Sequence, residues 1–368
     1  MNRRTRRTIW IVAAVLVVLG AAIFLRYVAP PEAARLLPES DGILYFNVKT
    51  VRSFAHFKDL KPPQHAQDYQ QFIEAIGIDP EQDVDEAAIA LHRMADPSGP
   101  NGPVAYSMVL VGKITGARLN GWLEAHAASR ESYAGHTIYS IPSEGRTVRV
   151  AQIGYDMVAV SNFPTTEMIH SMLDRHATAA LPIAGSTLLK RHWNYLFLPT
   201  PRPTVPLLSR RLAWGVGQIG LPFSDGCDAT TGEQSPTPQG SVGSVLGLPV
   251  PNNCTISVLG LSLPLKADST IVASAAPTLE GQLRLRIEEE TPSEEAAARQ
   301  AAALNLLVTL ARGFTVPLAG NNDNNSLKEL LKTAAVSQKH DRVVVTATVG
   351  RSLFSDAAAG ENALPKTF

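Results

Sequence analysis

The chain has 368 residues, 45% hydrophobic and 18% charged, which is the composition of a folded protein long enough for two domains of typical size. Its 33 basic and 33 acidic residues cancel, but five arginines, at positions 3, 4, 6, 7 and 26, flank the first apolar segment. The rest of the chain is therefore mildly acidic. This balance excludes the basic surface that nucleic-acid binding requires.

The N-terminal segment has the pattern of a membrane signal. Residues 9–25 are uncharged and mostly apolar, and as a helix they would cover about 25 Å, at the short end of the transmembrane range. The arginines before them favour a cytoplasmic N-terminus. We therefore expect residues 1–28 to form a basic head and a transmembrane helix. The alternative is a signal peptide cleaved after Ala22, but Ile23 to Leu25 continue the apolar run and favour an uncleaved helix.

The next segments predict a stalk and a first α+β domain. Residues 29–38 contain three prolines and are expected to form a short stiff stalk. Residues 39–180 combine short apolar strands with helices, a pattern typical of an antiparallel sheet with covering helices. The expected strands are 43–48, 104–111, 137–141, 148–153 and 157–161, and the expected helices are 69–76, 117–127 and 165–176.

The middle of the chain, residues 185–255, is predicted to be a connector. Four prolines between positions 199 and 206 favour extended chain over helix. Residues 224–253 are rich in Gly, Ser, Thr and Pro, and they contain too few large apolar residues to fold alone.

A second α+β domain is expected over residues 256–355, followed by a flexible tail at 356–368. Residues 282–290 alternate between apolar side chains on one face and charged side chains on the other, as a strand requires. Further strands are expected at 256–263, 269–276 and 342–349, and helices at 292–312 and from Ser326. The two domains have similar content, so a duplicated α+β unit is an open alternative.

The two cysteines, Cys227 and Cys254, both lie in the part expected outside the cytoplasm. An oxidising compartment permits a disulfide between them, which would restrain the connector at both ends. The alternative is two unpaired thiols. Neither cysteine has a second ligand at zinc-binding spacing, so no metal site is predicted.

Several motif-like patterns carry no predicted chemistry. Residues 215–220 match GxGxxG, but no helix or acidic residue follows at the required spacing, so no dinucleotide cofactor is expected. The alternating acids of residues 79–86 lack the glycine of a calcium loop. His170 and His176 are six positions apart and do not share a helix face. The chain contains no GxSxG, SxxK or HExxH motif, and no catalytic residue is predicted.

One stretch resembles a known family. Residues 36–48, Leu-Leu-Pro-Glu-Ser-Asp-Gly-Ile-Leu-Tyr-Phe-Asn-Val, follow the N-terminal apolar segment, and together they resemble uncharacterised bacterial envelope proteins of the DUF3352 type. That resemblance implies an exported α+β body and no site residues.

These observations predict a bacterial inner-membrane protein with one membrane pass at residues 9–25, its N-terminus inside and its bulk outside the cytoplasm. The function that fits best is an interaction or scaffolding module with an envelope protein as partner, rather than an enzyme. Two alternatives remain open at this point: an exported hydrolase with a dispersed active site, and a carrier of a small ligand or lipid.

Overall fold

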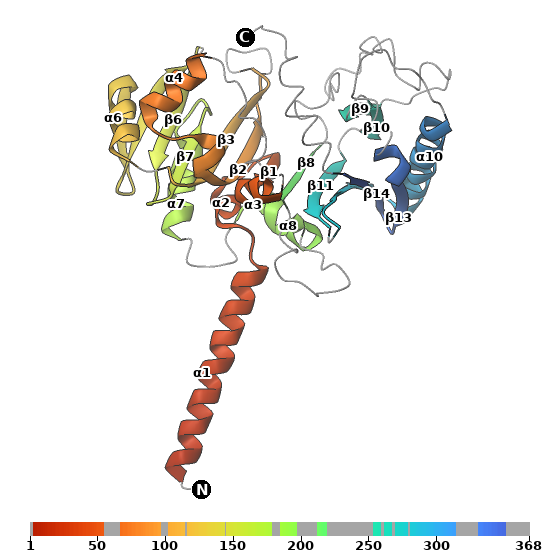
Figure 1. The fold of residues 1–368 in the computed structure, drawn as a ribbon, viewed down its shortest axis with the longest axis horizontal. Helices are drawn as coiled ribbons and strands as arrows, with labels where there is room; N and C mark the ends of the chain where they lie inside the picture. The colour runs from red at the N-terminus through yellow and green to blue at the C-terminus, as the bar shows by residue number, and fades with distance from the viewer. Residues whose placement is uncertain are drawn as a thin grey trace.

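The computed structural model describes most of the chain and defines its helices and strands (Figure 1). The described residues are 3–54, 67–96, 102–114, 116–143, 145–178, 185–196, 212–218, 253–258, 261–266, 269–278, 280–313 and 330–350. The helices are α1 (Arg3–Val28), α2 (Glu32–Leu36), α3 (Val48–Phe54), α4 (Gln67–Ile76), α5 (Pro80–Asp83), α6 (Ala117–His126), α7 (Glu167–Ala177), α8 (Thr187–Leu196) and α10 (Glu294–Gly313). The strands are β1 (Gly42–Phe46), β2 (Val84–Arg93), β3 (Val104–Gly112), β4 (Ser129–Tyr133), β5 (His136–Ser143), β6 (Arg146–Gln152), β7 (Met157–Ser161), β8 (Ala213–Gln218), β9 (Asn253–Val258), β10 (Leu261–Lys266), β11 (Thr270–Pro277), β12 (Leu283–Glu290), β13 (Ala335–Lys339) and β14 (Arg342–Val349).

One antiparallel sheet of twelve strands dominates the body. Its order is β13-β14-β12-β11-β8-β1-β2-β3-β7-β6-β5-β4, while β9 and β10 form a separate hairpin. The predicted α+β class and antiparallel pairing are therefore confirmed. The sheet takes strands from both predicted domains, 39–180 and 256–355, and β8 joins them from within the predicted connector.

The structure contradicts the prediction of a transmembrane helix at the N-terminus. α1 is helical and projects away from the body (Figure 1), but no helix in the described part of the chain is long and apolar enough to cross a membrane.

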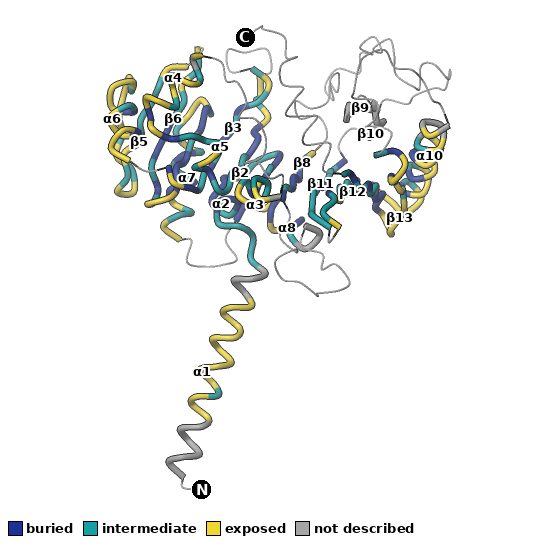
Figure 2. The backbone as a smooth tube through the Cα atoms, viewed as in Figure 1, coloured by how far each residue is buried: buried dark blue, intermediate teal, exposed yellow. Residues whose placement is uncertain are grey.

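The largest core lies on the sheet face that α2, α7 and α8 cover, and it runs across both halves of the sheet (Figure 2). Ile169, Met172 and Leu173 of α7 are fully buried there, as the apolar stripe of the predicted helix 165–176 requires. The opposite face is covered by α4 and α6 in the first half and by α10 in the second. Alternation along β3 separates the two cores, because Val109 packs into the first and Leu110 into the other.

The junction of the two halves is the pairing of β8 with β1 on one side and β11 on the other. Trp214 of β8 stacks on Tyr45 of β1 with ring centroids 5.3 Å apart, and Trp193 of α8 meets Trp214 edge-on at 5.8 Å. A Cβ on residue 215 would lie 2.8 Å from Leu44 Cδ2 and 3.3 Å from the Ile43 carbonyl oxygen, so the close packing of β1 on β8 favours glycine here. The glycines at the start of the GxGxxG match therefore belong to a central strand.

Glycine is required at position 112, where β3 passes a bulge in β2. The register shifts between Val84 and Glu86, and a Cβ on residue 112 would overlap the Asp83 carbonyl oxygen and approach Val84 Cα to 2.8 Å. These are backbone atoms and cannot rotate aside. We therefore expect Gly112→Ala to lower the free energy of unfolding by about 1–3 kcal/mol in urea denaturation.

The control for this substitution is Gly121→Ala. Gly121 lies in the exposed middle of α6, and a Cβ there meets nothing within 4 Å. Alanine should stabilise the helix at this position by about 0.5–1 kcal/mol. Equal free energies of unfolding for the two variants would contradict the steric argument.

Candidate functional site

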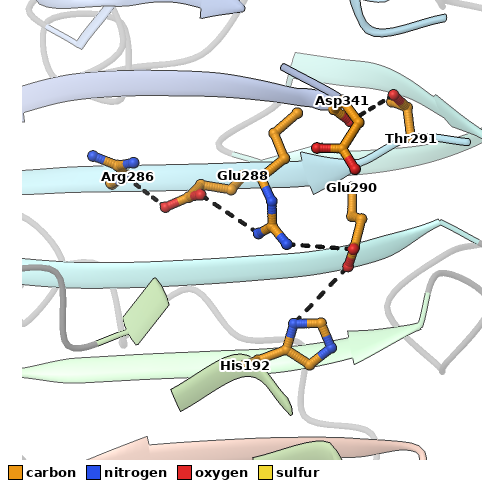
Figure 3. A network of polar contacts seen from close by, with 7 residues as sticks. His192, Arg286, Glu288, Glu290, Thr291 and Asp341 are labelled. Atoms are coloured by element: carbon orange, nitrogen blue, oxygen red, sulfur yellow. Dashed lines mark hydrogen bonds and ion pairs between the residues drawn. The ribbon is translucent and has the colours of Figure 1, made fainter. Parts of the chain in front are cut away.

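A network of charged side chains links α8 to strands β12 and β14 on the face that carries the largest core (Figure 3). Arg286 Nε donates to Glu288 Oε1 at 2.6 Å, and Arg342 Nη1 lies 3.8 Å from Glu288 Oε2. Arg342 Nη2 lies 3.3 Å from Glu290 Oε1, and Glu290 Oε2 lies 4.0 Å from Nδ1 of His192. Arginine and glutamate side chains therefore alternate along the network.

Strand geometry explains how these residues meet. Side chains two apart on β12 point to the same face, which places Arg286, Glu288 and Glu290 together. The β12–β14 register sets Glu290 directly opposite Arg342. The alternation of residues 282–290 predicts that these charges share one face, and the structure buries the end of that face: Glu288 is 3% and Arg342 8% exposed. Arg342 and His192 were not identified from the sequence, because each becomes a partner only through distant packing.

The network pairs buried charges of opposite sign, Glu288 and Arg342. Removing a carboxylate or guanidinium from water costs several kcal/mol per ion, which attraction and hydrogen bonding must offset. Burial lowers the pKa of His192 below its ordinary value, while the carboxylate of Glu290 acts in the opposite direction. Where the strand ends, Thr291 Oγ1 donates to the carbonyl oxygens of Asp341 at 2.7 Å and Ser293 at 3.0 Å. The arrangement holds α8 and β14 to the end of β12.

A second polar cluster combines serine and histidine, the residue types of a hydrolase. His92 Nε2 lies 2.9 Å from Ser107 Oγ, and Ser107 Oγ lies 3.0 Å from Ser161 Oγ, across strands β2, β3 and β7. Both serines are 0% exposed and His92 is 4% exposed. Burial lowers the pKa of His92 to about 4, against an opposing contribution from Asp41. Because neither hydroxyl reaches solvent, this cluster does not favour the hydrolase alternative.

A third cluster lies at the surface between α7 and the β4–β5 hairpin. The ring of Tyr133 stacks on His170 with centroids 3.8 Å apart, and its hydroxyl donates to Asp174 Oδ2 at 3.0 Å. His170 Nε2 lies 2.9 Å from Glu131 Oε1. The hydrogen bond to Asp174 raises the pKa of the Tyr133 phenol. These contacts fasten the hairpin to the helix.

The exposed surface of α1 is apolar on every side. Four consecutive residues, Val15 to Val18, cover a full helical turn and are each at least 59% exposed. Large apolar side chains exposed over the helix are Trp10, Ile11, Val12, Val15, Leu16, Val17, Val18, Leu19, Ile23 and Phe24. A contiguous apolar surface of this kind marks a site of interaction rather than a solvated element.

The other residues singled out in the sequence do not form a site in the described structure. Cys227 lies outside the described residues, Cys254 lies in β9 opposite Leu265, and no disulfide is seen among the described residues. The predicted pairing therefore stays a prediction. The acidic residues 79–86 form α5 and the start of β2, where Asp79 Oδ1 accepts from the Glu81 amide at 3.0 Å. Across the described ranges, no three or more His, Cys, Asp or Glu side chains are placed to hold a metal ion.

Comparison with known proteins adds little to this picture. No protein-family model matches the chain, and neither does any curated protein. A solved structure titled "Structure of crystal form I of TP0453" superposes with a TM-score of 0.42 and 10% sequence identity, over 89% of this chain and 96% of that chain. At this level the likeness carries no argument about function.

Proposed function

We propose that the protein is an interaction module of the bacterial envelope that is held at a membrane surface by its N-terminal helix. The observation that carries this proposal is the exposed apolar surface of α1 between Trp10 and Phe24. Transferring one such Leu, Ile, Val or Phe side chain from water to an apolar environment contributes about 1.5–3 kcal/mol. Ten large side chains together give a strong drive toward lipid.

The charges around the helix support the same partner. Arginines occupy positions 3, 4, 6 and 7, directly before the apolar surface. Basic residues next to an apolar segment are attracted to anionic phospholipids by about 1 kcal/mol each. The body carries an acidic excess and is held away from such a surface, so it remains available to an envelope protein. Because the bacterial envelope is oxidising, we also expect a disulfide between Cys227 and Cys254.

The test is flotation of the full chain with vesicles of phosphatidylethanolamine and phosphatidylglycerol. We expect the wild-type protein to float with the vesicles. Leu19→Asp should reduce the bound fraction at least tenfold at limiting lipid. The variant loses a leucine whose transfer into lipid contributes about 1.5–3 kcal/mol, and it adds a charge that lipid disfavours.

The matched control is Leu306→Asp on α10. Leu19 and Leu306 are each 54% exposed, so the two substitutions are alike except in their position. Leu306→Asp should float like the wild-type protein. The contrary result is a wild-type protein that stays in the dense fraction as an oligomer that the Leu19→Asp substitution dissociates. That result would show that α1 binds protein, and it would overturn the membrane proposal.

A further inference from the structure

Two histidine rings lie close together where the β4–β5 hairpin meets the C-terminal end of α7. His136 is the first residue of β5, His176 lies in the last turn of α7, and their ring centroids are 6.0 Å apart with planes inclined by 74°. Both are partly exposed. The site is rigidly built, because Tyr133, which pairs with His136 across the hairpin, is stacked on His170 of the same helix.

The hydrogen bonding of His136 leaves one ring nitrogen available to a ligand. Its Nδ1 lies 3.0 Å from the carbonyl oxygen of Gln152. A carbonyl can only accept, so Nδ1 carries the proton and Nε2 of the neutral ring carries the lone pair. Metal-binding histidines characteristically donate their other nitrogen to a backbone carbonyl in this way, which fixes both tautomer and ring orientation.

The spacing of the two rings matches that of imidazoles sharing a metal ion. With a metal–nitrogen distance of 2.0–2.1 Å, the centre of a ligating ring lies about 3.2 Å from the metal. Two such rings have centroids about 4.5 Å apart at a right angle at the metal and about 6.4 Å apart when opposite. The observed 6.0 Å lies within this interval.

We propose that His136 and His176 bind a divalent late transition-metal ion at the surface, with solvent completing its coordination. Imidazole nitrogen suits Cu(II), Ni(II) and Zn(II), and the affinity order predicts that Cu(II) binds most tightly. A site with two protein ligands agrees with the lack of any larger ligand group among the described residues. The bound ion would fasten α7 to the hairpin and stabilise the folded state by an amount that grows with the logarithm of the metal concentration above the dissociation constant.

The experiment is calorimetric titration of the full chain, without an affinity tag and freed of metal, with Cu(II) and then Zn(II). We expect one ion per chain. His136→Asn keeps an N–H donor for the Gln152 carbonyl but lacks the ligating nitrogen, and His176→Ala removes the second ligand. Each should weaken Cu(II) binding at least tenfold without changing the circular dichroism spectrum.

The matched control is His126→Ala. His126 has the same kind of contact, with Nδ1 2.8 Å from the Trp122 carbonyl oxygen, but its ring stacks on Trp122 at 4.3 Å. This variant should bind Cu(II) like the wild-type protein. Absence of one-to-one binding by the wild-type chain, or unchanged binding in both His136→Asn and His176→Ala, would overturn the proposal.

Discussion

Replacing Arg342 by methionine should lower the free energy of unfolding by about 3–5 kcal/mol, the range found when one partner of a buried ion pair is removed. Arg342 lies between the carboxylates of Glu288 and Glu290, and Glu288 is 3% exposed. Methionine fills a similar volume, so the loss reflects the carboxylate left behind more than a cavity. Urea denaturation at neutral pH measures this difference.

The control for Arg342→Met is Arg284→Met. Arg284 is on the neighbouring strand β12 and its side chain is exposed, so the same substitution should change stability by no more than about 0.5 kcal/mol. Adding Glu288→Gln to Arg342→Met should restore part of the loss, because without Arg342 the buried charge of Glu288 is offset by Arg286 in place of two arginines. If Arg342→Met were as stable as Arg284→Met, the network would contribute no charge compensation.

Lowering the pH from 7 to 4 should destabilise the protein through His92 by about 3 kcal/mol, the free energy that corresponds to its pKa shift. Burial lowers the pKa of His92 from 6.5 to about 4. Between these values the unfolded chain binds a proton that the folded chain does not, so stability falls as the pH falls. The contribution is complete above pH 6.5 and is lost progressively toward pH 4.

The measurement compares the stability of the wild-type protein and His92→Gln across this pH range. His192 is also a buried histidine with a lowered pKa, so the difference between the two proteins, rather than the wild-type curve alone, reports on His92. As the pH falls from 7 to 4, the free energy of unfolding of the wild-type protein should fall relative to that of His92→Gln. A difference that does not vary with pH would show that His92 titrates normally.

Local periodicity in the sequence was sufficient for the elements that bury one clear face. The predicted strand 282–290 corresponds to β12, and the predicted helices 165–176 and 292–312 correspond to α7 and α10. Gly77 has a φ of +70° and follows α4, which ends at Ile76 as predicted. The α+β class follows from such elements, because alternating strands and amphipathic helices must bury their apolar faces against one another.

Elements without such a face were not predicted. β2 begins inside the acidic residues 79–86 and is stabilised by strands on both sides rather than by its own pattern. β8 is a short glycine-containing segment within the proline-rich connector, and only pairing with β1 and β11 makes it a central strand. The edge strand β4 is mostly polar and exposed, so it lacks the alternation that identifies a strand.

By itself, the sequence determined the α+β class, the apolar segment at 9–25 and the acidic balance of the remainder, because composition and periodicity depend on neighbouring residues alone. Only the tertiary structure decided which charges are buried and which side chains meet. His192 has no carboxylate near it in sequence, yet lies 4.0 Å from Glu290. His136 and His176 are brought together only when α7 packs against the sheet. Such contacts arise from pairing register and helix packing, and these depend on free energy summed over the whole fold.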